Sequence, residues 1–217
     1  MKLLAVRVAR SIWLVPRYFL NPRGAYTRPV AEAIKAKYSF HKTPLDTPPP
    51  QGEAIKYEGG MFNGKNGEIL IVSMTLHDDG VVVDTRSSTD DGDSFLEDLI
   101  SWVSKDYGLP SITALPIKRI YVSELNVAFS NPPAIFNPKL ASFLSEISSA
   151  IGDDKRGKAD FIGFQFGTDQ TRSKNPFAFR FERELNTPFE ENRYYSFSPT
   201  KTDIHIKLLE QLEQLAT

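Results

Sequence analysis

A run of alternating apolar and polar residues at positions 68–86 constrains the fold more than any other feature of the sequence. The apolar members of its first half are Leu70, Val72, Met74 and Leu76. Period-two spacing is typical of a strand that buries one face. The turn Asp78-Asp79-Gly80 follows, and these residue types tolerate the positive φ angles of a tight turn. Residues 81–85 are therefore predicted to return as the second strand of an antiparallel hairpin.

Similar alternation predicts further strands at residues 4–14, 119–129, 160–167 and 177–184, with a shorter strand at 193–198. Aromatic residues, which pack well on a pleated surface, make up 12% of the chain. Two of these strands are rich in phenylalanine. Their predicted inward residues are Ile162, Phe164 and Phe166 in one strand, and Phe177, Phe179 and Phe181 in the other.

Apolar residues three and four positions apart predict four helices. A short one begins at Pro29; a second has Ser94 and Glu97 as a capping box and stops at Gly108; a third follows Pro138; and Thr202 caps the last. The residues expected to face the core are Phe95, Leu96, Leu99, Ile100 and Val103 in the second helix, Leu140, Phe143, Leu144, Ile147 and Ile151 in the third, and Ile204, Leu208, Leu212 and Leu215 in the last.

Hairpins joined by short turns, with helices interspersed, predict an α+β fold of two layers. We expect a mainly antiparallel, possibly mixed, β-sheet covered by helices on one side. A parallel crossover between strands 118–129 and 160–167 stays open, because a helix separates them. The chain is predicted to form a single domain, 1–217, in which the proline-rich segment 43–52 is a surface linker. Two hairpin-plus-helix halves, 53–130 and 131–217, are only hinted at.

The sequence contains no cysteine, which excludes disulfides, zinc–thiolate sites and a cysteine nucleophile. It also has no permitted Asn-X-Ser/Thr sequon and no apolar run near the roughly 18 residues that a membrane span needs. These features predict a cytoplasmic protein that has no membrane partner.

The N-terminal segment is basic. The first 31 residues contain six basic and no acidic side chains, while residues 32–217 carry a net charge of −7, from 20 basic and 27 acidic residues. Such a start resembles a transit peptide in composition, but its period-two apolar residues favour a strand. Arginines there alternate with aromatic residues such as Trp13 and Tyr18, a combination that suits single-stranded nucleic acid. The candidate nucleic-acid or anion-binding residues are Arg17, Arg23, Arg28, Lys155, Arg156, Lys158, Arg172 and Lys174. A sequence pI of about 6.3 argues against this interpretation.

Several motifs resemble catalytic or metal sites but fit them poorly. Residues 59–65 contain Gly-x-x-x-x-Gly-Lys, but Asn66 replaces the hydroxyl residue of a phosphate-binding loop and a strand follows instead of a helix. The acidic residues of 90–98 suit the start of a helix better than a calcium loop. Ser196 or Ser198 with Asp203 and His205 could assemble a triad, but turn and cap roles explain these serines better.

A metal-dependent nuclease typically collects an acid, a Glu or Gln and a lysine on adjacent strands. Asp160 and Gln165 offer part of that set, without a lysine at short spacing. Arg180, Glu182 and Glu184 alternate as on a solvated strand face with cross-strand ion pairs.

Since no titratable cluster matches a reaction template, the leading prediction is a non-catalytic protein-interaction or assembly subunit, with a protein partner or a homo-oligomer. Whether the chain is an enzyme stays uncertain, leaning to no, and no catalytic residue, metal site or cofactor is predicted. The alternative is a nucleic-acid-binding protein that uses the basic, aromatic-rich N-terminal segment. A metal-dependent hydrolase or nuclease comes third.

Overall fold

The computed structural model describes residues 1–20, 27–44, 54–65, 67–108, 110–131, 138–151, 161–169, 171–172 and 177–215. Residue contacts divide the chain into two compact units. We call Val6–Glu124 with Pro199–Asp203 the N-terminal unit, and Met1–Ala5 with Leu125–Ser198 and Ile204–Thr217 the C-terminal unit. The prediction of a single domain stays a prediction.

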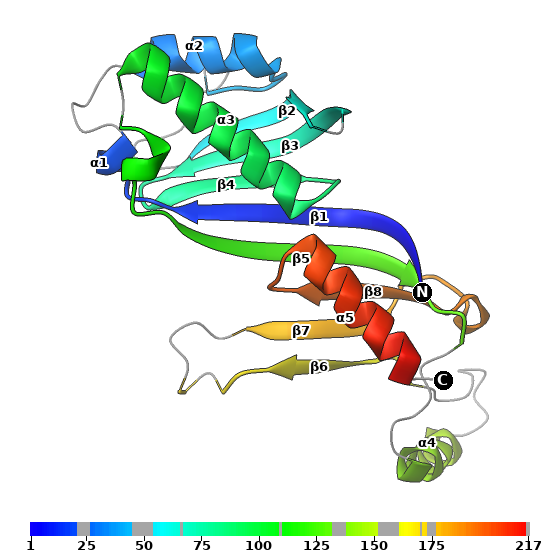
Figure 1. Cartoon of the computed structure of the whole chain (residues 1–217). Helices are drawn as coiled ribbons and strands as arrows, with labels where there is room; N and C mark the ends of the chain where they lie inside the picture. The colour runs from blue at the N-terminus through cyan, green and yellow to red at the C-terminus, as the bar shows by residue number, and fades with distance from the viewer. Residues whose placement is uncertain are drawn as a thin grey trace. The chain divides into compact units, whose positions relative to one another are not determined.

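The fold is of the predicted α+β class (Figure 1). The strands are β1 (Lys2–Leu14), β2 (Ile55–Gly64), β3 (Gly67–His77), β4 (Gly80–Thr85), β5 (Lys118–Ala128), β6 (Gly163–Gly167), β7 (Ala178–Arg183) and β8 (Arg193–Ser198). The α-helices are α1 (Arg17–Leu20), α2 (Thr27–Tyr38), α3 (Thr89–Tyr107), α4 (Pro138–Ile151) and α5 (Thr202–Leu215). Two 3₁₀ turns, η1 (Ile112–Ala114) and η2 (Phe189–Glu191), complete the elements.

In the N-terminal unit the strand order is β2-β3-β4-β1-β5. Strand β1 confirms the predicted first strand, and β3 and β4 confirm the predicted hairpin, which pairs antiparallel from Ile71 with Thr85 to His77 with Gly80. The buried residues of β3 differ from a simple alternation: Ile69, Ile71 and Met74 are buried, whereas Leu70 is 46% exposed. A register shift between Ile71 and Ser73 explains this, because a β-bulge changes which face the following residues occupy.

Helix α3 begins earlier than the sequence predicts. Ser88, in an extended conformation, caps it by accepting a hydrogen bond from the backbone N–H of Asp91, so the predicted capping box at Ser94 is wrong. The cap is decided by backbone conformation, and Ser94 already lies inside the helix. The predicted end is confirmed, since Gly108 is the left-handed C-cap. All five predicted core residues of this helix are buried.

Both α2 and α3 pack on the sheet of the N-terminal unit. Tyr38 of α2 lies 4.8 Å, ring centre to ring centre, from Phe95 of α3, which in turn lies 5.6 Å from Phe62 of β2. The ring of Phe40 lies so close to Gly60 that a Cβ there would come within 2.5 Å of it. The continuous hydrophobic core formed in this way, from Trp13 to Leu115, lies within the N-terminal unit.

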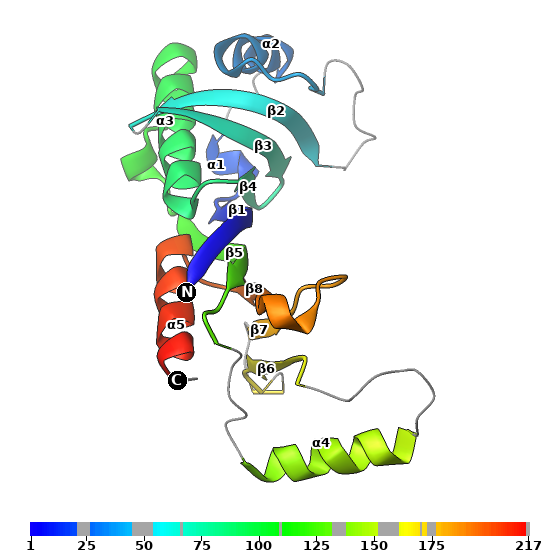
Figure 2. The ribbon, with the colours of Figure 1, turned by 90° about the vertical axis from the view of Figure 1, so that its right-hand side faces the viewer.

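In the C-terminal unit the strand order is β5-β8-β7-β6, and β6–β7 and β7–β8 pair antiparallel. Strands β5 and β6 are thus not neighbours, so the parallel pair that we left open between these segments does not form. Figure 2 shows α5 running alongside these strands. Aromatic rings continue across one face, since Phe164 stacks on Phe181 at 5.5 Å and Phe181 on Tyr194 at 4.5 Å.

The burial predicted for this unit is partly wrong. Phe181 is fully buried, but Phe166 and Ile162 of the predicted inward set are 62% and 64% exposed, and Phe177 is 49% exposed. In α5 the buried residues are His205 and Leu209, while the predicted core residues Ile204, Leu208 and Leu215 are exposed. In α4, Phe143 is 56% exposed instead of buried. A single helix, about 10 Å across, is too narrow to cover four strands that lie about 4.8 Å apart.

Two further points complete the fold. Of the predicted linker 43–52, Thr43 is buried, and residues 45–52 lie outside the described part of the chain. Among the described residues, no helix is both long enough and apolar enough to cross a bilayer.

Candidate functional site

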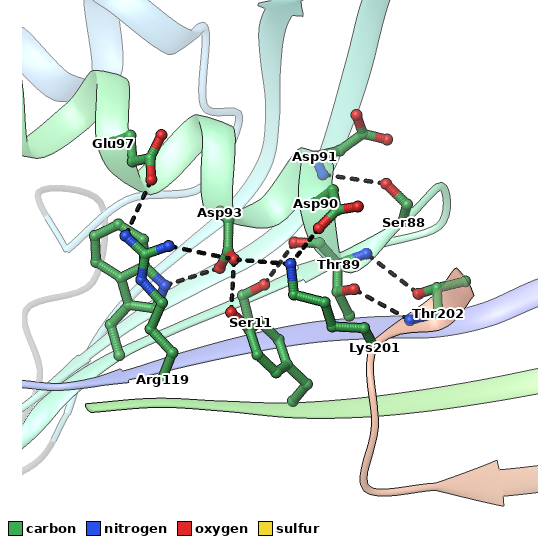
Figure 3. Close-up of polar contacts among 12 residues, drawn as sticks. Ser11, Ser88, Thr89, Asp90, Asp91, Asp93, Glu97, Arg119, Lys201 and Thr202 are labelled. Carbon is green, nitrogen blue, oxygen red and sulfur yellow. Dashed lines mark hydrogen bonds and ion pairs between the residues drawn. The ribbon is translucent and has the colours of Figure 1, made fainter. Parts of the chain in front are cut away.

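The densest polar network of the N-terminal unit surrounds Asp93, one turn into α3 (Figure 3). Asp93 is only 6% exposed. One of its carboxylate oxygens accepts a hydrogen bond from the indole N–H of Trp13 on β1, and the other accepts one from the hydroxyl of Tyr121 on β5, both at 2.8 Å. Burying a carboxylate is costly unless its oxygens are hydrogen-bonded, and here both are.

Two cations flank this carboxylate. Arg119 and Lys201 each lie 3.8 Å from the same Asp93 oxygen, and each also forms a closer pair with another acid of α3: Arg119 with Glu97 at 3.0 Å, and Lys201 with Asp90 at 2.5 Å. The same cations lie over aromatic rings. The guanidinium of Arg119 lies 4.3 Å from the ring centre of Trp13, and the ammonium of Lys201 lies 5.1 Å from that of Tyr121. Both are cation–π contacts.

The first turn of α3 is fixed by reciprocal hydrogen bonds. The backbone N–H of Thr89 donates to the hydroxyl of Thr202, and the N–H of Thr202 donates to the hydroxyl of Thr89, both at 3.2 Å (Figure 3). The hydroxyl of Ser11 donates to the carbonyl of Thr89 at 2.8 Å. A Cβ at Gly92 would lie 2.9 Å from the Ser11 hydroxyl oxygen, so glycine permits the close approach of α3 to β1.

The electrostatics keep these groups in their bonded forms. Burial, followed by the hydrogen bond to Asp93, raises the pKa of Tyr121 above its ordinary value, so the hydroxyl keeps its proton and continues to donate. The hydrogen bond to Asp90 raises the pKa of Lys201. Each carboxylate oxygen of Asp93 is occupied by protein donors. The network therefore has the character of a structural clamp around a buried carboxylate. Its two exposed acids, Asp90 and Glu97, are each paired with a cation.

The acidic residues of 90–98 do not converge on one point. Asp90, Asp93 and Glu97 turn to the partners described above, and Asp98 accepts a hydrogen bond from the hydroxyl of Tyr38 at 2.6 Å. No group of three or more His, Cys, Asp or Glu side chains within the described residues could hold a metal ion. This arrangement is typical of carboxylates that stabilise the first turns of a helix and accept hydrogen bonds from neighbouring donors.

The serine and histidine considered for a triad do meet in the C-terminal unit. The Ser196 hydroxyl oxygen lies 2.8 Å from Nε2 of His205, and both residues are fully buried. However, that hydroxyl donates its only proton to the carbonyl of Arg180, also at 2.8 Å. Its contact with His205 must then be one that it accepts, with Nε2 carrying the proton. A histidine in this form cannot act as a base on Ser196, so the pair ties α5 to β8 and does not resemble a nucleophile.

The phosphate-loop interpretation is excluded by backbone structure. Residues 59–64 belong to strand β2, which turns directly into β3 with no helix at that point. Asn66 lies outside the described residues.

Of the nuclease set, the described members have other neighbours: Gln165 pairs across the strands with Arg180, and Glu184 bonds Arg193 at 2.9 Å. Asp160 lies outside the described part of the chain.

Most of the basic candidate residues lie in segments that the structure does not describe: Arg23, Lys155, Arg156, Lys158 and Lys174. Arg17 lies in α1. Arg28 is exposed and pairs with Glu32 one turn further along α2, and Arg172 is exposed and pairs with Asp169. The described side chains of this set, Arg28 and Arg172, are thus each paired with an acid of their own unit.

The Asp93 network was not predicted from the sequence. Asp93 was grouped with the other acids of 90–98, and Trp13, Arg119 and Lys201 were not connected with it. A usable signal was present, because Asp93 precedes Leu96 and Ile100 at helical spacing and so lies on the buried side of α3.

The most distinctive surface of the molecule is apolar. Of the fourteen large hydrophobic residues that are exposed among those described, eleven belong to the C-terminal unit. They include Phe166 on β6 and Ile204 and Leu208 on α5. Large exposed apolar surfaces commonly mark sites of interaction.

Comparison with known proteins gives no relative: no protein family, no curated protein and no solved structure matches this chain.

Proposed function

We propose that this protein is a non-catalytic protein-interaction or assembly subunit, and that it binds its protein partner through the C-terminal unit. The observation that carries the proposal is the unequal distribution of exposed hydrophobic residues, eleven of fourteen in that unit among the residues described. The polar networks around Asp93 and Ser196 support the proposal indirectly. Both side chains are buried, and both hydrogen-bond to other residues of the protein.

One of these exposed residues, Phe166, shares a strand face with three other phenylalanines. Phe164 pairs across the sheet with Phe181, and Phe166 pairs with Phe179, so all four rings lie on one face. Exposure increases towards the edge strand β6: Phe181 is buried, Phe164 and Phe179 are half-buried, and Phe166 is 62% exposed. Aromatic residues are enriched in protein interfaces because they bury a large area with few rotatable bonds.

Helix α5 forms the wall of this surface. Glu213 bonds the N-terminal ammonium group of Met1 and the backbone N–H of Ser130 just beyond β5, so its side of the helix faces β1 and β5. Ile204 is nine residues from Glu213, two and a half helical turns, and therefore lies on the opposite side, towards β7 and β6. We name the surface the open face and define its members as Phe164, Phe166, Phe179, Ile204, Leu208 and Leu215.

A site-specific photo-crosslinker tests the proposal. p-Benzoylphenylalanine at Phe166, in cells of the native host, is expected to yield a discrete crosslink to a partner or to a second copy of the chain. The same group at Leu70, which is 46% exposed on β3, is the matched control and is expected to yield none. Purified protein carrying Phe166→Ser and Leu208→Ser is expected to lose the interaction in a reciprocal pull-down while keeping its circular dichroism spectrum.

The opposite result is equally clear. A chain that is monomeric by light scattering and forms no crosslink from position 166 would contradict the proposal. Nucleic-acid binding through the basic residues remains the alternative prediction. It requires retention on single-stranded DNA or RNA at low salt that Arg17→Ala, Arg23→Ala and Arg28→Ala together weaken.

A further inference from the structure

The part of the strands that α5 leaves uncovered is about as wide as one α-helix. Strands lie about 4.8 Å apart, and an α-helix with its side chains is about 10 Å across, so one helix covers roughly two strands. The C-terminal unit has four strands, β5, β8, β7 and β6, and α5 packs its buried residues His205 and Leu209 on one part of them. In the N-terminal unit, by contrast, both α2 and α3 pack on the sheet.

The same unit contains a helix whose apolar stripe is partly exposed. In α4, Phe143 is 56% exposed, and Leu144 and Ile147 are half-buried, all on one side of the helix. The other side bears small polar residues, and Ser142, Ser145 and Ser149 are exposed. The sequence of α4, PKLASFLSEISSAI, has only two charged residues, Lys139 and Glu146. A helix of this kind is suited to packing on a sheet.

The chain connections allow α4 to reach the open face. Nine residues separate the end of β5 at Ala128 from Pro138, and eleven separate Ile151 from Gly163, the first residue of β6. Extended chain spans about 3.3 Å per residue, so these connections reach roughly 30 and 36 Å. A sheet of four strands is only about 15 Å wide. Helix α4, with 14 residues, is about 21 Å long, against about 17 Å for the five residues of β6.

We propose that α4 docks in cis on the open face, beside α5 and across β7 and β6, with Phe143 and Ile147 against Phe164 and Phe166. This inference rests on the proposed function and adds its regulation: α4 covers the surface that the partner binds, and a partner must displace it. Helix α4 is a suitable occupant for two reasons. It directly precedes the edge strand β6 in the chain, and its stripe is apolar, as the open face is. A covalently attached segment also competes at a high effective concentration.

Distance measurements between two spin labels test the docking. The chain has no cysteine, so Ser149→Cys on the polar side of α4 and Gln211→Cys on the exposed side of α5 would be the only labelled sites. The isolated doubly labelled protein is expected to give one narrow distance distribution. Phe143→Asp with Ile147→Asp is expected to abolish the narrow peak and give a broad, longer distribution. Ser142→Asp, on the opposite side of α4, is the matched control and is expected to leave the peak unchanged.

Dilution with unlabelled protein separates docking in cis from exchange between copies. A peak that survives tenfold dilution is intramolecular and supports the proposal; a peak that disappears comes from a second copy and overturns it. A broad distribution in the starting protein, unchanged by Phe143→Asp with Ile147→Asp, also overturns it. Circular dichroism of each variant confirms that the fold is kept.

The crosslink from position 166 distinguishes the two proposals. Removal of the docking with Phe143→Asp and Ile147→Asp is expected to increase the yield of partner crosslinked at 166. A narrow distance peak without any crosslink under all conditions would leave the docking in place and contradict the partner. A crosslink whose yield does not respond to the α4 variants, together with a broad distribution, would keep the partner and contradict the docking.

Discussion

The two units solve the same packing problem differently. The N-terminal unit covers its sheet with α2 and α3, and their aromatic residues meet those of β2 in a closed core. The C-terminal unit has a comparable row of aromatic residues on β6, β7 and β8, and in the part that the structure describes α5 packs beside it while Phe166 on β6 is left exposed. The comparison teaches that an apolar strand face specifies where a helix can pack, while the number of helices decides whether the face is buried.

The largest expected effect tests whether the N-terminal core is closed. Phe95 is fully buried among rings from α2 and β2, so Phe95→Ala is expected to lower the free energy of unfolding by about 3–5 kcal/mol, through lost burial and the cavity that remains. Urea unfolding measures it. Phe177→Ala, at a ring of the C-terminal unit that is 49% exposed and lies outside the open face, is the matched control and is expected to change stability by less than about 1 kcal/mol. Equal losses in the two variants would remove the contrast between the units.

The next effect concerns alkaline pH. Burial raises the pKa of Tyr57 to about 12, from 10 in the unfolded chain. Because the folded pKa is the higher one, this contribution is complete below pH 10 and is lost as the pH rises from 10 to 12, by roughly 2–3 kcal/mol in total. Tyr57→Phe is expected to flatten this part of the stability curve, measured by urea unfolding between pH 8 and 12. A curve identical to that of the unaltered protein would show that Tyr57 is not buried as described.

A third variant addresses the clamp of the N-terminal unit. Asp93→Asn keeps the shape of the side chain but replaces one acceptor by a donor, facing Trp13 or Tyr121. The expected loss is about 1–3 kcal/mol, the usual cost of a buried polar group without a partner. Glu97→Gln, which weakens the exposed pair with Arg119, is the control and is expected to cost less than about 1 kcal/mol. If Asp93→Asn and Glu97→Gln lower the free energy of unfolding equally, the hydrogen bonds of Asp93 contribute no more than an exposed ion pair does.

The smallest effect on stability is expected at the open face. Phe166→Ser removes a ring that is 62% exposed, so the free energy of unfolding is expected to change by at most about 1 kcal/mol. Binding of a hydrophobic dye at the C-terminal unit is expected to decrease. A loss of stability as large as that of Phe95→Ala would mean that Phe166 belongs to a closed core that no partner can reach, and would remove the basis of the proposed function.

Local patterns predicted the elements well because they depend on near neighbours. The period-two spacing identified β1 and the β3–β4 hairpin, and the 3/4 spacing identified α3 with its buried face. The bulge in β3 was not predicted, since the register shift after Ile71 is set by pairing with β4 and has no signature in β3 alone. The start of α3 at Ser88 was missed because Ser94 and Glu97 have the right spacing for a cap inside a helix that had already begun.

Burial in the C-terminal unit was mispredicted for a different reason. The pattern of Ile162, Phe164 and Phe166 indicates which residues share a face, but burial also depends on which element covers that face. The position of β6 at the end of the strand order, and of α5 over other strands, is tertiary information. The same holds for Asp93, whose partners Trp13 and Lys201 are distant in sequence.

Each unit is built from separated parts of the chain, as the hydrogen bonds between Thr89 and Thr202 show. During synthesis on a ribosome, residues 6–124 would emerge long before Lys201 and Thr202. Until those two residues emerge, the acidic side chains in the first turn of α3 would be hydrated. Likewise, the opening residues Met1–Ala5 would have to wait for Glu213 to appear. Neither unit can be cut out as one uninterrupted fragment.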